Sequence, residues 1–372
     1  IALYFPSLSV EGISYFNMSG MQNLVKLDFR REGGIVVFTP NNSAKGYVQS
    51  GVAKPAPISG KLTMVWEHVT LDNPNIGAQN AIPGLEVISP TWFNLMDANG
   101  GRASAAYVES AHRKGYRVWG LVSNSFNASM TSALFKNARA MNLFMARLII
   151  YAKLYGLDGV NIDFEGMNET DRAQFVRFVA RISELLRPEG LTLSVDVFIP
   201  ANTKSSRSHD RGELAKYADY IMLMAYDEHW RTSPRAGSVA SMPWVTKAVE
   251  GTLAEGVPAS KLVLGVPFYM RRWEETKSGE GVKVKGYTLT MAEAEELSAK
   301  RGAPMQWLET QGQHYFTYVA NGKVQKVWVE NAASIERKLS LVGKYGLAGM
   351  AGWRKGHEKP EVWRTISSIM GK

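Results

Sequence analysis

The chain has 372 residues, 45% of them hydrophobic and 21% charged, and it lacks the run of about 18 uncharged apolar residues that could span a membrane. The absence of cysteine excludes disulfides, thiol catalysis and thiolate metal sites. The net charge of +9 favours a polyanionic partner, but the basic residues are scattered and form no stripe interleaved with aromatic residues, which argues against nucleic-acid binding.

The N-terminal segment, residues 1–51, differs in pattern from the rest of the chain. It shows strand signals at 10–15 and 34–38 around a short helical stretch at 18–27. Residues 52–60 contain two prolines and predict an extended linker, because each proline disfavours helical geometry in the residue before it. The segment resembles the tail of small amine-oxidase-N-terminal-like modules that precede wall-associated domains, and we expect it to be an anchoring remnant.

From residue 61 onward, strand and helix signals alternate, which is typical of parallel β-α units. Strands are predicted at 62–67, 85–90, 117–122, 155–165, 191–197, 220–226, 262–268 and 347–353. Helices are predicted at 105–114, 143–155, 171–187, 244–255 and 332–345. This count of strands is the number that closes a (β/α)8 TIM barrel.

The alternation breaks between about residues 273 and 330. A helical stretch at 291–300 is followed by alternating stretches at 314–318 and 326–329, with Asn321-Gly322 between them as a hairpin turn. We therefore predict an α/β fold: a (β/α)8 TIM barrel at 61–372 that carries a small α+β insertion between strands seven and eight.

The fourth strand carries the most distinctive polar pattern. Because side chains alternate along a strand, Asn161, Asp163 and Glu165 share one face, while Val160 and Ile162 point to the other. A half-exposed surface strand could show the same alternation, but such a strand usually mixes Lys, Thr and Arg with its acids. Neighbouring carboxylates raise one another's pKa and can keep one acid protonated near neutral pH. We interpret this strand as catalytic.

Other polar and aromatic residues fall at the same ends of neighbouring strands, where TIM barrels place their active sites. These residues are Trp66, Met224, Tyr226, Asp227, Arg271 and Trp353. Carboxylates above an aromatic floor are suited to holding and hydrolysing sugars. Trp92, Phe126 and Trp230 occupy similar positions, although core packing is an equally good explanation for each.

These motifs resemble glycoside hydrolase family 18, the chitinase-like family. Residues 158–165 match its Asp-Gly-x-Asp-x-Asp-x-Glu motif except at Asn161, residues 224–227 match Met-x-Tyr-Asp, and Trp353 matches the tryptophan of the final strand. The resemblance covers residues 61–372. The amino-acid sequence of strand four is most similar to that of the branch that acts on peptidoglycan, which includes spore-cortex-lytic N-acetylglucosaminidases.

The resemblance implies retaining, substrate-assisted catalysis, in which the substrate's acetamido group attacks the anomeric carbon. Glu165 would be the acid and then the base, Asp163 would orient the acetamido group, and Tyr226 would donate a hydrogen bond to its carbonyl. Asp227 would position the sugar. The expected substrate-binding residues are Trp353, Asn161, Met224, Trp66 and Arg271. The mechanism requires no metal and no cofactor.

We therefore expect an enzyme that cleaves β-1,4 bonds after N-acetylglucosamine in bacterial peptidoglycan, because the basic charge suits an anionic wall polymer. A chitinase acting on chitin oligomers and a non-hydrolytic, lectin-like sugar-binding protein are the alternatives, although Glu165 argues against the second. We expect a monomer whose partner is a polysaccharide, extracellular or associated with a bacterial cell wall. The chain begins at Ile1 without an apparent leader, which suggests a processed product.

Overall fold

The computed structural model describes residues 52–95, 101–279 and 281–372, together with four short strands nearer the N-terminus. These strands form two antiparallel pairs: β1 (Leu8–Val10) with β2 (Ile13–Tyr15), and β3 (Leu27–Glu32) with β4 (Ile35–Pro40). Of the helix predicted at 18–27, all but Leu27 lies outside the described residues, and Leu27 begins β3. The division at residues 51 and 60 stays a prediction.

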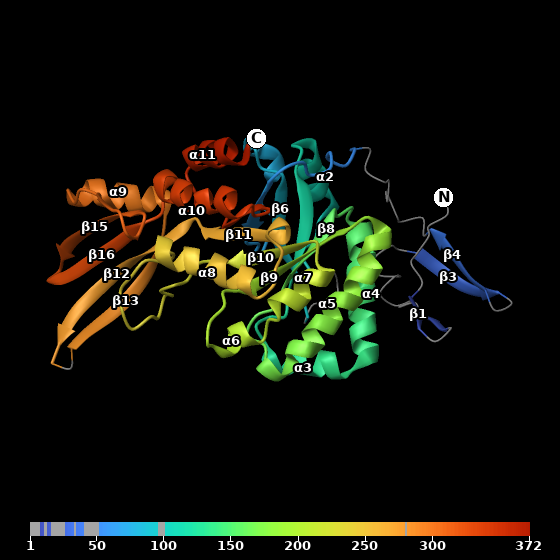
Figure 1. The fold of residues 1–372 in the computed structure, drawn as a ribbon. Coiled ribbons are helices and arrows are strands. Elements are labelled where there is room, and N and C mark those ends of the chain that lie inside the picture. Colours follow the sequence, from blue (N-terminus) through green and yellow to red (C-terminus); the bar gives the residue numbers. More distant parts are fainter. Residues whose placement is uncertain are drawn as a thin grey trace.

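Parallel strands close into a barrel in the order β10-β11-β17-β5-β6-β7-β8-β9, which confirms the predicted (β/α)8 TIM barrel (Figure 1). The strands are β5 (Leu62–Glu67), β6 (Val87–Asn94), β7 (Arg117–Ser123), β8 (Gly159–Asp163), β9 (Thr192–Phe198), β10 (Tyr220–Met224), β11 (Leu262–Pro267) and β17 (Gly349–Trp353). Each begins within two residues of its predicted start except β8, which is shorter at both ends.

Helices surround this barrel. They are α2 (Ala105–Arg113), α3 (Ala128–Lys136), α4 (Ala138–Leu154), α5 (Arg172–Leu186), α6 (Lys204–Arg207), α7 (Arg211–Tyr217), α8 (Met242–Ala254), α10 (Ala332–Tyr345) and α11 (Pro360–Met370). Their formation follows from sequence: α5 buries Phe175, Phe178 and Ile182 at helical spacing. The boundary between α3 and α4, which was not predicted, lies at Asn137, whose side chain caps α4 by accepting from Ala140 N.

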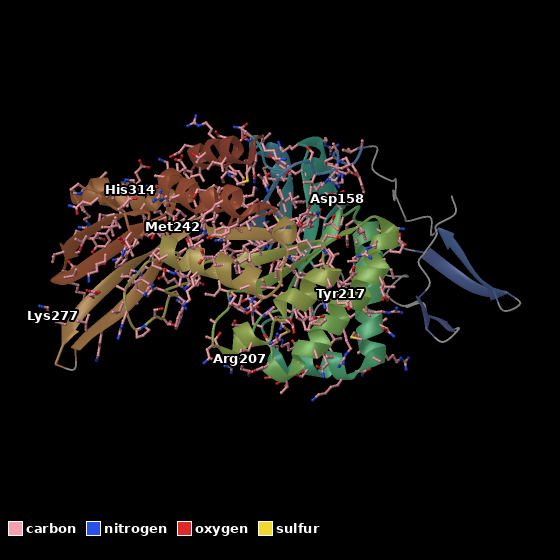
Figure 2. The ribbon with its side chains drawn as sticks, viewed as in Figure 1. Asp158, Arg207, Tyr217, Met242, Lys277 and His314 are labelled. Atoms are coloured by element: carbon pink, nitrogen blue, oxygen red, sulfur yellow. The ribbon has the colours of Figure 1, made fainter. Side chains whose placement is uncertain are left out.

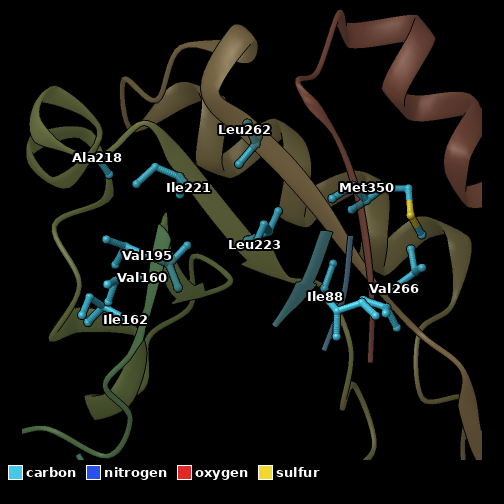
Figure 3. Close-up of a cluster of buried hydrophobic side chains, with 14 of the residues drawn as sticks. Ile88, Val160, Ile162, Val195, Ala218, Ile221, Leu223, Leu262, Val266 and Met350 are labelled. Atoms are coloured by element: carbon cyan, nitrogen blue, oxygen red, sulfur yellow. The ribbon is translucent and has the colours of Figure 1, made fainter. Parts of the chain in front are cut away.

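The apolar side chains form two layers. The outer layer lies between the strands and the helices and includes Val160, Ile162, Val195 and Leu223 (Figure 3). The inner layer fills the barrel and consists of Leu62, Met64, Trp66, Val87, Trp119, Leu121, Met222, Val263 and Ala351. Because the interior is packed, substrate access is confined to the mouth above this inner layer.

A five-stranded antiparallel sheet, in the order β13-β12-β16-β15-β14, follows β11 and carries α9 (Met291–Arg301). Its strands are β12 (Tyr269–Ser278), β13 (Gly281–Thr290), β14 (Gln306–Leu308), β15 (Gln313–Ala320) and β16 (Lys323–Val329). Figure 2 shows Lys277 and His314 within this insertion, which projects to one side of the barrel. The insertion begins at Tyr269, earlier than the predicted residue 273. The turn at Asn321-Gly322 has positive φ at both residues, as a tight hairpin requires.

Asp158, the first acid of the strand-four motif, lies at the opposite end of β8 from the barrel mouth (Figure 2). Its Oδ2 accepts from Val118 N at 2.9 Å and lies 2.8 Å from His112 Nε2, and Lys54 Nζ is 3.4 Å from Oδ1. Burial alone would raise the pKa of Asp158, but the hydrogen bonds from His112 and Val118 and the charge of Lys54 together hold it below its ordinary value. Asp158 is therefore a structural residue.

Replacing Asp158 by asparagine should lower the free energy of unfolding by about 3 kcal/mol at neutral pH, because a buried charged acceptor of two hydrogen bonds is lost. The lowered pKa means that this contribution is present above about pH 4 and disappears on acidification. Urea unfolding of both proteins at neutral and acid pH measures it. Asp219→Asn is the matched control: Asp219 precedes β10 and is exposed, and within the described part of the chain its side chain accepts only from Leu193 N, so about 1 kcal/mol is expected. Equal losses in the two variants would contradict the assignment.

Candidate active site

Asp163 and Glu165 lie at the C-terminal end of β8. Asp163 is the last residue of the strand, and Glu165 follows in the loop above it. The side chain of Asn124, which follows β7, holds the Glu165 backbone in both directions: its Oδ1 accepts from Glu165 N at 3.0 Å, and its Nδ2 donates to Glu165 O at 2.7 Å. Since Asn124 is itself fully buried, this clamp fixes where the Glu165 side chain begins.

The carboxyl groups of Asp163 and Glu165 are hydrogen-bonded to each other, and the pKa of each is strongly raised. Burial, followed by the charges of Asp163 and Asp196, raises the pKa of Glu165 to about 9. Burial also raises the pKa of Asp163, to about 7, against the opposing effect of the hydrogen bond with Glu165. Glu165 is therefore protonated at neutral pH and can donate a proton.

Asn161 and Trp66 lie beneath these acids, and the structure does not place them where a substrate could reach. Asn161 is fully buried and Trp66 is 1% exposed. The Asn161 Oδ1 accepts from Trp66 Nε1 at 2.9 Å and from Ser89 Oγ at 3.1 Å, while its Nδ2 donates to Asp196 Oδ1 at 2.7 Å. The expectation that Asn161 and Trp66 contact substrate is therefore wrong for this structure: their polar atoms are used within the barrel.

Tyr226 and Asp227 follow β10, whose last residue is Met224. Burial, then the charge of Asp196, raises the pKa of Tyr226 well above its ordinary value, so the phenol remains a hydrogen-bond donor. Asp227 is exposed, has a φ of 60°, and accepts hydrogen bonds from Tyr269 Oη at 2.5 Å and Arg271 Nη2 at 3.2 Å. Met224 is only 7% exposed, and it contributes to the floor of the mouth.

Arg271 is already engaged by the protein. Its guanidinium lies 4.8 Å from the centre of the Tyr269 ring, and its Nη atoms donate to Asp227 and to Thr288. The side chain is 10% exposed. Arg271 thus orients Asp227 directly, and any contribution to substrate binding adds to that role.

The aromatic candidates divide clearly by exposure. Trp353, at the end of β17, is half-buried, and its ring centre lies 6.2 Å from that of Trp66. Phe126 and Trp230 are 63% and 52% exposed, whereas Trp92 is fully buried and donates to Asn73 Oδ1. Phe126 and Trp230 therefore remain candidates for sugar stacking, and Trp92 belongs to the core.

Four residues of the site were not predicted from sequence: Ser89, Asn124, Asp196 and Tyr269. Asp196 gave a detectable signal, because it is a lone acid inside the apolar strand that runs from Leu191 to Val197. Asn124 also follows a predicted barrel strand, where polar residues indicate function. Tyr269 likewise follows the barrel strand predicted at 262–268, whereas Ser89 gave no signal because its role depends on a contact across strands.

A protonated acid beside a second carboxyl, with aromatic rings at the mouth of a TIM barrel, is suited to acid catalysis on a sugar. Among the residues that the structure describes, no cluster of three or more His, Asp or Glu side chains could hold a metal ion. Within the same residues, no helix has the length and apolarity needed to cross a bilayer. The arrangement is that of a glycoside hydrolase.

The family profile "Glycosyl hydrolases family 18" matches residues 118–357, and the chain belongs to that family. It is 28% identical over 281 residues to the uncharacterized glycosylase YvbX of Bacillus subtilis, covering 72% of this chain and 78% of the relative. It is 25% identical over 248 residues to a cortical fragment-lytic enzyme of Bacillus anthracis, covering 65% of this chain and only 56% of that relative.

Solved structures share the fold. The chitinase of Chromobacterium violaceum aligns with a TM-score of 0.75 at 24% identity, over 84% of this chain and 99% of the other. The spore cortex-lytic enzyme SleL of Bacillus cereus aligns with a TM-score of 0.75 at 22% identity, over 94% of this chain and 81% of the other. These likenesses confirm the barrel architecture.

Proposed function

We propose that this glycoside hydrolase cleaves β-1,4 bonds after N-acetylglucosamine in bacterial peptidoglycan, with retention of configuration and with the substrate's acetamido group as nucleophile. The observation that carries the proposal is the pair of Glu165 and Asp163. Glu165 holds a proton at neutral pH, and Asp163 Oδ1 is buried without a hydrogen-bond partner in the described residues. An acetamido N–H would satisfy that acceptor.

In the first step, the acetamido carbonyl oxygen forms a bond to the anomeric carbon while the bond from that carbon to the leaving oxygen breaks. Glu165 transfers its proton to the leaving oxygen, and Asp163 accepts a hydrogen bond from the acetamido N–H. In the second step, Glu165 takes a proton from water, whose oxygen bonds to the anomeric carbon as the acetamido carbonyl oxygen leaves. Both displacements occur at one carbon, so the configuration is retained.

Tyr226 supports this chemistry as a donor, since its raised pKa keeps the phenol protonated beside the carboxyl groups. A phenol proton directed at the acetamido carbonyl would hold that oxygen near the anomeric carbon. Asp227, held by Tyr269 and Arg271, is exposed and available to a sugar hydroxyl. Trp353 would support the ring that undergoes attack.

The choice of peptidoglycan over chitin is supported by cationic side chains near the mouth. His68 follows β5, while Arg354 and His357 follow β17. Burial, then the charges of Arg354 and Arg102, lowers the pKa of His68, and burial with Arg354 lowers the pKa of His357 to about 4. Positive charge next to Trp353 therefore comes from the arginines, and it suits the carboxylates of muramic acid and its peptides.

Arg354 offers a direct test of this preference, because its guanidinium makes no hydrogen bond or ion pair with the described part of the chain. Arg354→Gln should raise KM for peptidoglycan fragments about tenfold, the effect of losing about 1.4 kcal/mol of charge-assisted binding. KM for uncharged chitin oligomers should not change. Steady-state kinetics on both substrates measure this. An equal increase for both would assign Arg354 to general sugar contacts.

One experiment separates this proposal from the two alternatives, a chitinase and a lectin-like sugar-binding protein. Purified peptidoglycan and chitin oligomers are incubated with the wild-type protein, and the Glu165→Gln variant serves as control. Release of wall fragments by the wild type alone supports the proposal, and turnover of chitin oligomers alone supports a chitinase. Binding without turnover of either substrate would indicate a lectin-like protein. Relatives named for lysis of spore cortex or its fragments support the wall polymer and an extracellular or wall-associated location.

A further inference from the structure

Asp196 lies in the active site but has no role in the scheme above. It is on β9, is 2% exposed, and accepts from Asn161 Nδ2 at 2.7 Å. The Asn161 oxygen is engaged by Trp66 and Ser89, so its amide nitrogen is the group left to face Asp196. Position 161 is where the strand-four motif has an acid, and here an amide on β8 faces an acid on β9 instead.

The strand register brings Asp196 beside Asp163. Parallel pairing of β8 with β9 aligns Asn161 with Ser194 and Ile162 with Val195, so one further residue aligns Asp163 with Asp196. Neighbouring strands lie about 4.8 Å apart, and Asp163 points to the same face as Asn161. On its other side Asp196 aligns with Met222, which is apolar and fully buried. Asp163 is thus the charged neighbour of Asp196 in the sheet.

The buried carboxyls of Asp163 and Asp196 and the partly buried carboxyl of Glu165 therefore share a small region without a compensating cation. No lysine or arginine of the described residues forms a hydrogen bond or ion pair with Asp163, Glu165 or Asp196. The charge of Asp227, after β10, also raises the pKa of Glu165, and the charges of all three carboxyls raise the pKa of Tyr226. Carboxylates this close cannot all ionise in a buried site, so protons must be retained.

We propose that Asp163 and Asp196 form a carboxyl pair that holds one proton between them, and that Asp196 is a positioning residue that carries this proton while Asp163 serves the substrate. The inference deepens the proposed substrate-assisted function and rests on it. Asn161 and Trp66 both donate hydrogen bonds to Asp196, which fixes the orientation of its carboxyl group beside Asp163. In this arrangement the amide at position 161 is complementary to Asp196 and does not weaken the site.

Two substitutions separate this role from a structural one. Asp196→Asn keeps an oxygen for Asn161 and a neutral donor, so at acid pH kcat should stay within about tenfold of wild type. The amide cannot ionise, so the repulsion that Asp196 exerts on Glu165 disappears and the alkaline limb of the kcat profile should move down by about one pH unit. Asp196→Ala removes the positioning group as well, and kcat should fall about 10²-fold.

The pH profiles are measured with an aryl glycoside of an N-acetylglucosamine oligomer, so that the result does not depend on peptidoglycan as substrate. Asp158→Asn is the control for a buried carboxyl at the far end of the barrel, and its profile should match wild type. An unchanged alkaline limb in Asp196→Asn, or equal kcat losses in the two Asp196 variants at acid pH, would overturn the proposal.

A second readout requires no turnover. Carboxyls whose pKa is raised by folding lower the stability of the protein as pH rises above their unfolded values. Asp196→Asn should therefore lose less stability than wild type between mildly acid and mildly alkaline pH, as measured by urea unfolding. Equal losses of stability in the two proteins would contradict a shared proton, even if the protein cleaves no glycoside. A smaller loss in Asp196→Asn, found in a protein that cleaves no glycoside, would overturn only the proposed function.

Discussion

Glu165→Gln should reduce kcat on any cleaved glycoside by about 10²- to 10⁴-fold, the usual contribution of a positioned general acid. Glutamine has nearly the same shape as protonated glutamic acid, and the Asn124 clamp holds only the backbone of residue 165. Binding of uncleaved oligomers should therefore persist. Stopped and continuous assays of kcat, together with calorimetric binding, measure the two quantities separately.

The stability of Glu165→Gln provides the control against a folding defect. Because burial raises the pKa of Glu165 to about 9, wild-type protein loses stability as pH rises from about 4 toward that value. Glutamine has no proton to lose, so the melting temperature of the variant should equal or exceed that of wild type, most clearly at alkaline pH. A variant that keeps wild-type kcat would remove Glu165 from the role of acid.

Asp163→Asn should reduce kcat by about 10²- to 10³-fold, which is the effect of removing one group that stabilises developing charge. An amide at this position cannot supply the negative charge that orients the acetamido N–H. The charge of Asp163 also raises the pKa of Glu165, so the alkaline limb of the kcat profile should move to lower pH in the variant.

Asp219→Asn serves again as a matched carboxyl-to-amide change, because Asp219 is exposed and lies at the opposite end of the barrel strands. Its profile should coincide with that of wild type. If Asp163→Asn keeps kcat within about tenfold of wild type, or if its alkaline limb is unmoved, the carboxyl at 163 has no part in the reaction.

The barrel could be predicted from sequence because its strands are short apolar runs separated by helical patterns. The β5 strand coincides with the predicted range, and the apolar stripe of α5 identified that helix. The strands β12 and β13 were not predicted, because charged residues occur on both faces of β12 and hide the alternation that marks a half-buried strand. Their place in the sheet depends on pairing: β12 pairs with β13 on one side and with β16 on the other.

Within the site, sequence placed Asp163 and Glu165 at the right end of the barrel, since three motifs fell at the ends of predicted strands. It could not separate exposed aromatics from buried ones. Trp66 and Trp230 both lie near the C-terminal ends of predicted barrel strands, yet the first is 1% exposed and the second 52% exposed. It also assigned Asn161 to substrate, because a sequence does not show that Ser89 and Asp196 approach from neighbouring strands.

The central claim is best tested by identifying the new sugar ends that the wild-type protein creates in purified peptidoglycan. The anomer of the first ends released is read by proton NMR, and the digest is then reduced with borohydride so that the reduced sugar can be identified by mass spectrometry, with the Glu165→Gln digest as blank. The account predicts reduced N-acetylglucosamine at every new end, released initially as the β anomer. New ends that carry reduced N-acetylmuramic acid, or an α anomer at first release, would contradict it.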